Sequence, residues 1–210
     1  MIGWNEEIKK SLGACGENVF IGHNVMITQP QNVFLGDNVR IDPFTLITSK
    51  LKTGNYVQIT AYAMLGGSHN TITLGDWTFI GYGSKLFTNN EDYSGNEGPV
   101  NEYWGSNKVY SGDITFNNYA GVASDVIVFP NVTLPEGCCI GAKSLVTKSK
   151  YEVRSVWEDK IEYRLEGEHR TYKPLEPFTV YVGNPLHHFK SRNKEQILKL
   201  SKDPSWLKQR

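Results

Sequence analysis

A six-residue repeat of aliphatic side chains constrains this chain more than any other feature. Its clearest run is Val122, Val128, Leu134, Ile140 and Val146, at an unbroken spacing of six. Shorter runs at the same spacing are Leu35, Ile41, Ile47 and Leu74, Ile80, Leu86. The spacing fits neither the period of an α-helix nor the alternation of a half-buried strand. It predicts a parallel β-helix, an all-β solenoid in which each repeat supplies one strand of a stacked coil.

Turn-forming residues lie between the aliphatic positions. Examples are Asp37-Asn38, Gly54-Asn55 and Asn117-Asn118. Gly, Asn and Asp accept a positive φ more readily than other residues, so we expect them at the corners of the coils. The aliphatic residues should point inward and fill the solenoid. We therefore expect function on its edges, in its insertions or between subunits.

Composition favours one globular domain without net charge. The 210 residues include 22 Lys and Arg and 22 Asp and Glu, so the formal net charge is zero, which argues against nucleic acid or an anionic membrane as partner. The sequence contains neither a signal-like apolar start nor an apolar run of about 18 residues, so we expect a cytoplasmic protein. Three cysteines are an odd count, and we expect buried reduced thiols.

Interruptions of the repeat divide the chain. We predict an N-terminal helical cap over 1–16, a β-helix over 17–149, a charged hairpin over 150–179, and a C-terminal turn and helix over 180–210. Within the hairpin, Ile161–Leu165 is expected as one strand and Tyr172 in the return strand. The β-helix itself is broken at 66–73, which contains His69, and by a loop insertion over 91–113. Such a long loop in a compact fold is usually functional or disordered.

Two stretches resemble the hexapeptide-repeat acyltransferases, which include galactoside, maltose and xenobiotic acetyltransferases. They are FNNYAGVASDVIVFPNVTLPEGCCIGAKSLVTKS and VYVGNPLHHFKSR. A third stretch, LFTNNEDYSGNEGP, resembles a subgroup with an Asp-Asp-Tyr-Ser-Gly loop that acylates sugars and amino sugars of surface polysaccharides. The resemblance covers roughly residues 17–149 and 180–190. It implies a left-handed β-helix, a homotrimer with active sites between neighbouring prisms, and acetyl-CoA as co-substrate with no metal.

The same resemblance implies positions for the cofactor. Small residues that match those along the pantetheine arm are Gly121, Ala123, Gly141, Ala142 and Ser144. Lys148 matches a basic residue near the nucleotide phosphates. Asn184 and Pro185, after Gly183, match the turn that closes over the cofactor, and the basic residues Lys190 and Arg192 follow it.

One departure concerns the catalytic base. The galactoside and xenobiotic enzymes carry a catalytic His after the coil that ends near Leu86, and this chain has none there. The nearest is His69, which should lie on the same edge as Asn89 because three repeats make one coil. An imidazole suits a general base, and a carboxylate can hold its tautomer.

His69 is therefore the candidate base, and Asp92 or Glu91 the candidate carboxylate. We expect Asn89, Asn90, Glu91 and Tyr93 to contact substrate. The structural alternatives are a corner histidine and a turn that only launches the loop. Trp77 is expected in solenoid packing or a subunit contact. The other histidines are weaker candidates. His23 is expected on the surface, His187 and His188 on the surface or beside the cofactor, and His169 lies in the charged segment after the coils.

The favoured function is acetylation of an amino group on a nucleotide-linked deoxyamino sugar, such as a 4-amino-4,6-dideoxyhexose. An amine is a better nucleophile than a hydroxyl and needs less base catalysis, and the acidic loop can hold an ammonium group. Acetylation of a sugar hydroxyl and a non-catalytic binding solenoid are the alternatives. A γ-type carbonic anhydrase needs three zinc-binding histidines, whereas His69 is alone in the middle coils.

Overall fold

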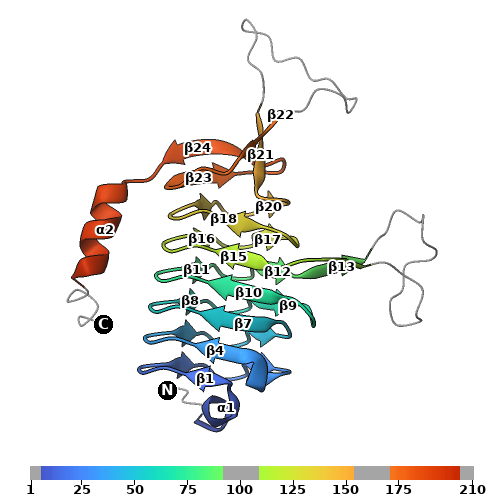
Figure 1. Ribbon diagram of the computed structural model, residues 1–210, viewed down its shortest axis with the longest axis vertical. Coiled ribbons are helices and arrows are strands. Elements are labelled where there is room, and N and C mark those ends of the chain that lie inside the picture. Colours follow the sequence, from blue (N-terminus) through green and yellow to red (C-terminus); the bar gives the residue numbers. More distant parts are fainter. Residues whose placement is uncertain (1–5, 92–108, 154–170, 204–210) are drawn as a thin grey trace, which may run out of the picture.

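The computed structural model describes residues 6–91, 109–153 and 171–203. Its body is a prism of six stacked coils, each with one strand in each of three parallel sheets (Figure 1). Sheet A contains β1 (Ala14–Cys15), β4 (Val33–Leu35), β7 (Lys50–Thr53), β10 (Thr71–Leu74), β15 (Ile114–Phe116) and β18 (Thr133–Leu134). Sheet B contains β2 (Phe20–Ile21), β5 (Arg40–Ile41), β8 (Gln58–Ile59), β11 (Phe79–Ile80), β16 (Gly121–Val122) and β19 (Cys139–Ile140). Sheet C contains β3 (Met26–Ile27), β6 (Leu46–Ile47), β9 (Met64–Gly66), β12 (Lys85–Phe87), β17 (Ile127–Val128) and β20 (Leu145–Val146).

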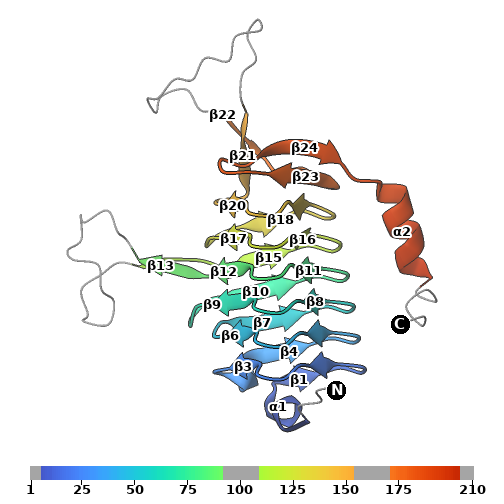
Figure 2. The same cartoon turned by 180° about the vertical axis from the view of Figure 1, so that it is seen from behind.

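Elements outside the coils close or extend the prism. Helix α1 (Glu6–Ser11) covers one end, and a short 3-10 helix, η1 (Pro30–Asn32), precedes β4. Strands β23 (Thr179–Val182) and β24 (His187–Ser191) extend sheet B at the other end. Two antiparallel arms leave the body: β13 (Asn89–Glu91) with β14 (Val109–Ser111), and β21 (Lys150–Val153) with β22 (Thr171–Pro174). Helix α2 (Lys194–Lys202) runs back along the prism (Figures 1 and 2).

The repeated aliphatic residues form the core, as predicted. The five residues from Val122 to Val146 at a spacing of six are at most 1% exposed. Residues on adjacent coils lie in register; for example, Ile80 pairs with Ile59 below it and with Val122 above it. Each strand of the coils is only two to four residues long, and this register stacks the inward side chains into continuous rows. The chain is the left-handed parallel β-helix that the repeat and the resemblance predict.

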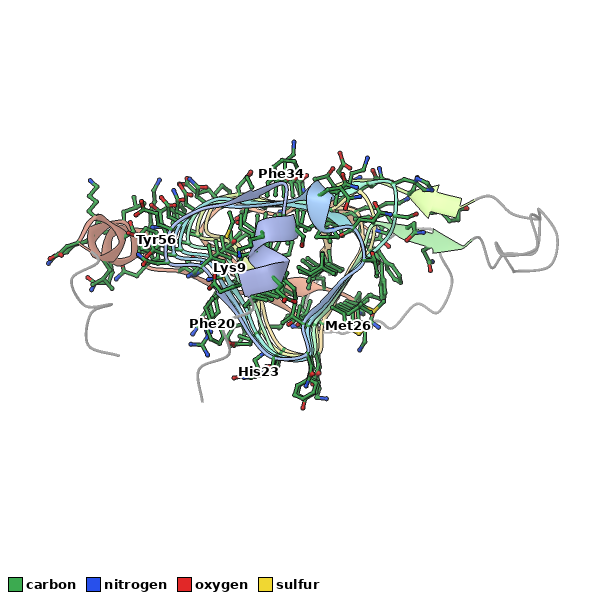
Figure 3. The ribbon with its side chains drawn as sticks, turned by 90° about the horizontal axis from the view of Figure 1, so that it is seen from below. Lys9, Phe20, His23, Met26, Phe34 and Tyr56 are labelled. Carbon is green, nitrogen blue, oxygen red and sulfur yellow. The ribbon has the colours of Figure 1, made fainter. Side chains whose placement is uncertain are left out.

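The prism has three corners, each named here by the two sheets that meet at it, and they differ in what covers them (Figure 3). At the A–B corner, beside Tyr56, the outward side of the prism is covered by α2. The Tyr119 hydroxyl lies 3.1 Å from that of Ser201 in α2. At the C–A corner the β13–β14 arm projects away from the body. Among the described residues, neither a helix nor an arm covers the B–C corner, which is marked by His23.

A ladder of side-chain oxygens stabilises the A–B corner. Asp37 Oδ1 accepts the backbone N–H of Glu17 at 2.8 Å, and Asn55 Oδ1 accepts that of Asp37 at 2.8 Å. Asp76 Oδ1 accepts the N–H of Asn55 at 2.7 Å, and Asn118 Oδ1 accepts that of Asp76 at 2.9 Å. Each oxygen therefore accepts a hydrogen bond from a backbone N–H of the preceding coil that lies outside the strands. The Asp and Asn residues expected at corners act through their side chains as well as through their backbone conformation.

Several boundaries differ from the prediction. The N-terminal helix ends at Ser11, because Ala14–Cys15 already pair with Phe34–Leu35 in sheet A. Tyr172 lies in a return strand as expected, but its partner is Glu152. The predicted strand Ile161–Leu165 lies outside the described residues. Cys15 is exposed, whereas Cys138 and Cys139 are buried as expected.

The corner ladder gives a stability prediction. In Asp76→Ala the N–H of Asn55 loses its acceptor, and we expect a loss of about 1 to 3 kcal/mol in unfolding free energy. Asp76→Asn keeps an oxygen at the same place and should remain close to the original stability. Urea unfolding followed by circular dichroism measures both. Equal stability of the Ala variant and the unsubstituted protein would show that water replaces the carboxylate.

Candidate active site

The C–A corner brings the break in the repeat next to the start of the arm. Gly66, at the end of β9, pairs with Phe87 on the next coil, and the N–H of Thr88 donates to the Gly66 carbonyl at 2.9 Å. The Thr88 hydroxyl donates to the same carbonyl at 3.1 Å. His69 and Asn89 therefore lie at the same corner on successive coils, as predicted from the spacing. We call the residues 66–71, 87–91 and 109–113 the arm corner.

Glycine is required where the break approaches the arm. Gly67 has a φ of 126°, in a region that favours glycine. A Cβ atom there would lie 1.8 Å from the Thr88 hydroxyl oxygen, so a side chain cannot fit without movement. The backbone N–H of Gly67 donates to the Thr48 hydroxyl at 3.0 Å. The following residues, Ser68 and His69, are exposed at the corner.

The candidate substrate residues lie on the arm itself. Asn89 pairs with Ser111 and Asn90 pairs with Tyr110, whose side chain is 62% exposed. Both asparagines are half-buried. Glu91 forms the last described residue of β13, opposite Val109. Asp92 and Tyr93 lie outside the described residues, so their expected contacts with His69 and with substrate remain predictions.

One carboxylate at this corner had no predicted role. Asp113 Oδ1 accepts the backbone N–H of Thr71 at 2.8 Å and the side-chain amide of Asn70 at 3.4 Å. On the other side, the Gly112 N–H donates to the Thr88 carbonyl at 2.9 Å. The signal available in the sequence was an Asp directly after the insertion, where the chain returns to the repeat. Its partner 42 residues earlier is visible only once the coils are stacked.

Five candidate cofactor residues lie at the B–C corner of the last coil, three on the coil itself and two on the C-terminal turn that meets it. The Ser144 hydroxyl accepts the N–H of Gly183 at 2.8 Å, and the Gly141 N–H donates to the Tyr181 carbonyl at 2.7 Å. Ala142 is exposed between Gly141 and Ser144, and Asn184 and Pro185 are exposed on the turn. We call Gly141–Ser144 with Gly183–Pro185 the terminal ledge.

The other candidate cofactor residues lie around this ledge. Gly121 is buried beneath Phe79, and a Cβ atom on it would lie 2.4 Å from the Phe79 ring. The carbonyl of Ala123, one coil before the ledge, accepts the Ser84 hydroxyl at 2.7 Å. Lys148 is exposed and follows β20, so it lies at the C–A corner, across sheet C from Ser144. Of the small residues at the ledge, Ala142 is exposed, whereas the space beside Gly141 is filled by Val182.

The remaining candidates for chemistry have structural or surface positions. His23 is exposed at the B–C corner of the first coil, His187 and His188 are exposed on β24, and His169 lies outside the described residues. Trp77 stacks on Tyr56 with ring centroids 4.1 Å apart, which agrees with the packing role expected for it. Burial raises the pKa of the Cys138 thiol to about 12, so it is not a thiolate near neutral pH.

The described residues offer no assembled metal site and no membrane span. Within them, no three His, Cys, Asp or Glu side chains gather in a way that could hold a metal ion. None of the helices in the described ranges has the length and apolar character needed to cross a bilayer. The geometry places an exposed imidazole at the same corner as the polar residues of the arm, and a ledge of small residues at another corner.

Comparisons with known proteins found an acyltransferase of related sequence. No family model matches the chain. The chain is 28% identical over 189 residues to an Escherichia coli dTDP-4-amino-4,6-dideoxy-D-glucose acyltransferase, covering 87% of this chain and 83% of the relative.

Solved structures of an N-acyltransferase resemble this chain over its full length. AntD, an N-acyltransferase from Bacillus cereus in complex with dTDP and 3-hydroxybutyryl-CoA, is 28% identical with a TM-score of 0.76, covering 99% of this chain and 96% of AntD. An AntD variant in complex with dTDP-4-amino-4,6-dideoxyglucose and coenzyme A is 27% identical with a TM-score of 0.77, covering 100% of this chain and 98% of the variant.

A more distant likeness concerns the fold alone. A hexapeptide-repeat acetyltransferase from Vibrio cholerae is 13% identical with a TM-score of 0.52, covering 89% of this chain and 78% of that protein. This likeness agrees with the three-sheet prism seen here. The chain is therefore similar over its full length to a nucleotide-sugar N-acyltransferase, and it has the fold of the hexapeptide-repeat acetyltransferases.

Proposed function

We propose that this protein transfers an acetyl group from coenzyme A to the amino group of a nucleotide-linked 4-amino-4,6-dideoxy sugar. The observation that carries the proposal is the full-length likeness to AntD, whose complexes contain dTDP with an acyl-CoA, or dTDP-4-amino-4,6-dideoxyglucose with coenzyme A. The E. coli relative has the same class of acceptor in its name. The family resemblance implies acetyl as the transferred group. The acyl group in the AntD complex is 3-hydroxybutyryl, and it is the alternative to be compared with acetyl.

The residues take the following roles in this proposal. The terminal ledge binds the pantetheine arm through its backbone and small side chains. Lys148, across sheet C at the C–A corner, lies near the nucleotide phosphates of a coenzyme A bound to the ledge of another subunit. Asn89, Asn90, Glu91 and Tyr93 contact the sugar. The amine nitrogen attacks the thioester carbonyl carbon and forms the amide bond, while the carbon–sulfur bond breaks and coenzyme A leaves. His69 accepts the proton that the nitrogen loses, with Asp92 holding the imidazole.

We also propose that the protein is a homotrimer packed through sheet C. The outward positions of this sheet lie in register along the prism, and all but Lys85 are apolar: Met26, Leu46, Met64, Lys85, Ile127 and Leu145. At its B–C edge, Phe44 and Tyr62 stack with centroids 5.2 Å apart and are 50% and 63% exposed. A largely apolar exposed face of this kind marks an interaction surface. Outward residues of sheet A are mostly polar, such as Lys52, Thr73 and Thr115.

Burial of sheet C has a consequence for the site. Within one coil, Ser84 at the B–C corner and Thr88 at the C–A corner are separated by about 13 Å of extended chain. If sheet C is covered by a neighbour, a pantetheine arm cannot cross it from the ledge to the arm corner of the same chain. The ledge of one subunit then serves the arm corner of another.

The acceptor class is tested with two sugars that differ at one atom. With acetyl-CoA, we expect an amide product from dTDP-4-amino-4,6-dideoxyglucose and none from the analogue with a hydroxyl at C4, because the amine is the stronger nucleophile. Mass spectrometry identifies the products, and release of the coenzyme A thiol gives the rate. Acylation of the hydroxyl sugar alone would support the O-acetyltransferase, and reaction of neither would leave a non-catalytic module. Faster transfer from 3-hydroxybutyryl-CoA would overturn the acetyl assignment only.

The role of His69 is tested by its removal. His69→Ala should lower kcat by about a hundredfold or more, because the proton acceptor is lost, while the Kd for acetyl-CoA stays unchanged. His23→Ala removes an exposed histidine from another corner and should leave turnover unchanged. Steady-state kinetics and calorimetry measure the two quantities. Normal turnover of His69→Ala would remove the base assignment.

The assembly is tested by mass and by one surface substitution. Sedimentation should give a mass near three times that of the 23.7 kDa chain. Leu46→Asp places a charge in the apolar face of sheet C and should produce monomers, whereas Thr73→Asp on sheet A should not. A trimer that persists in Leu46→Asp would place the interface on another face.

A further inference from the structure

Asp113 holds the chain immediately after His69. Its Oδ1 accepts the backbone N–H of Thr71 at 2.8 Å and the side-chain amide of Asn70 at 3.4 Å. Both partners follow His69 by one or two residues. The carboxylate belongs to the chain just after the arm returns, directly before β15. The exit of the break is thereby tied to the base of the arm.

A second set of contacts holds the chain just before His69. The Gly66 carbonyl accepts both the N–H and the hydroxyl of Thr88, at 2.9 and 3.1 Å. Thr88 is fully buried, and its own carbonyl accepts the Gly112 N–H at 2.9 Å. Residues 67–69 are thus held between two anchors, and both anchors come from the two ends of the arm.

The Asp113 contact differs from the regular corner bonds in what it restrains. Asp76 makes the same kind of bond, to the Asn55 N–H at 2.7 Å, but the chain there follows the regular repeat. The break adds three residues to the repeat, and residues 67–70, between β9 and β10, belong to no strand, so strand pairing does not set their path. An exposed imidazole on such a segment needs a local restraint to keep its position.

We propose that Asp113 is a positioning residue for His69: by fixing Asn70 and Thr71, it sets the imidazole relative to the substrate residues on the arm. This inference rests on the proposed function, because it assigns to His69 the role of base. Asp113 does not touch the reacting atoms. It acts by restricting the segment, and small displacements of a reacting group have large effects on rate.

The test compares three variants at one temperature well below their unfolding transitions. Asp113→Ala removes the acceptor and should lower kcat about tenfold or more with an unchanged Kd for acetyl-CoA. Asp113→Asn keeps a side-chain oxygen and should recover most of the rate. Asp76→Ala loses the matched bond at the A–B corner and should keep full turnover. Amide hydrogen exchange at Thr71 should accelerate in Asp113→Ala only.

A second arm of the test combines Asp113→Ala with His69→Ala. If Asp113 acts through His69, the double variant should be as slow as His69→Ala alone, because the two effects are not additive. A further tenfold loss in the double variant would overturn the inference, and so would failure of Asp113→Asn to recover the rate. If His69→Ala retains normal turnover, the base assignment fails and the inference with it. Absence of acyl transfer by the unsubstituted protein would instead show that the proposed function is wrong.

Discussion

Each coil of this solenoid satisfies its backbone only through the coils above and below it. A strand of two residues cannot bury an apolar face or pair its hydrogen-bonding groups by itself. The six-residue register solves both problems, because it places Ile59, Ile80 and Val122 directly above one another while the strand pairs form. The corner ladder then supplies acceptors where the strands end. This register fixes which residues are inside, and therefore which remain at the corners for chemistry.

The two candidate sites lie at corners where the six-residue register is interrupted or ends. Where residues 66–73 and the arm interrupt the repeat, two segments distant in sequence meet at the C–A corner through the contacts of Thr88 with Gly66. Where the coils end, the Gly183 turn docks on Ser144 at the B–C corner. The A–B corner is covered by α2 through Ser201 and Tyr119. Sheet C, between the two candidate sites, is left with an apolar face that a second copy of the chain can bury.

Much of this arrangement could be predicted from the sequence, and the reasons are local. The spacing from Val122 to Val146 predicted the core, and the count of three repeats per coil predicted that His69 and Asn89 share an edge. Other features depend on contacts across many residues. Ala14–Cys15 has no inward aliphatic residue and becomes a strand only by pairing with β4. The partner of Asp113 is set by the stacking of coils around the arm, and that of Tyr172 by the return of the second arm to Glu152.

The central claim is that the ledge of one subunit serves the arm corner of another, and mixing two inactive variants tests it most directly. His69→Ala disables the arm corner, and Ala142→Trp fills the exposed ledge. Trimers assembled from equal amounts of both should show about a quarter of the original activity, because that fraction of shared sites draws an intact half from each variant. Mixed trimers no more active than the two parents would contradict the claim and place each site within one chain.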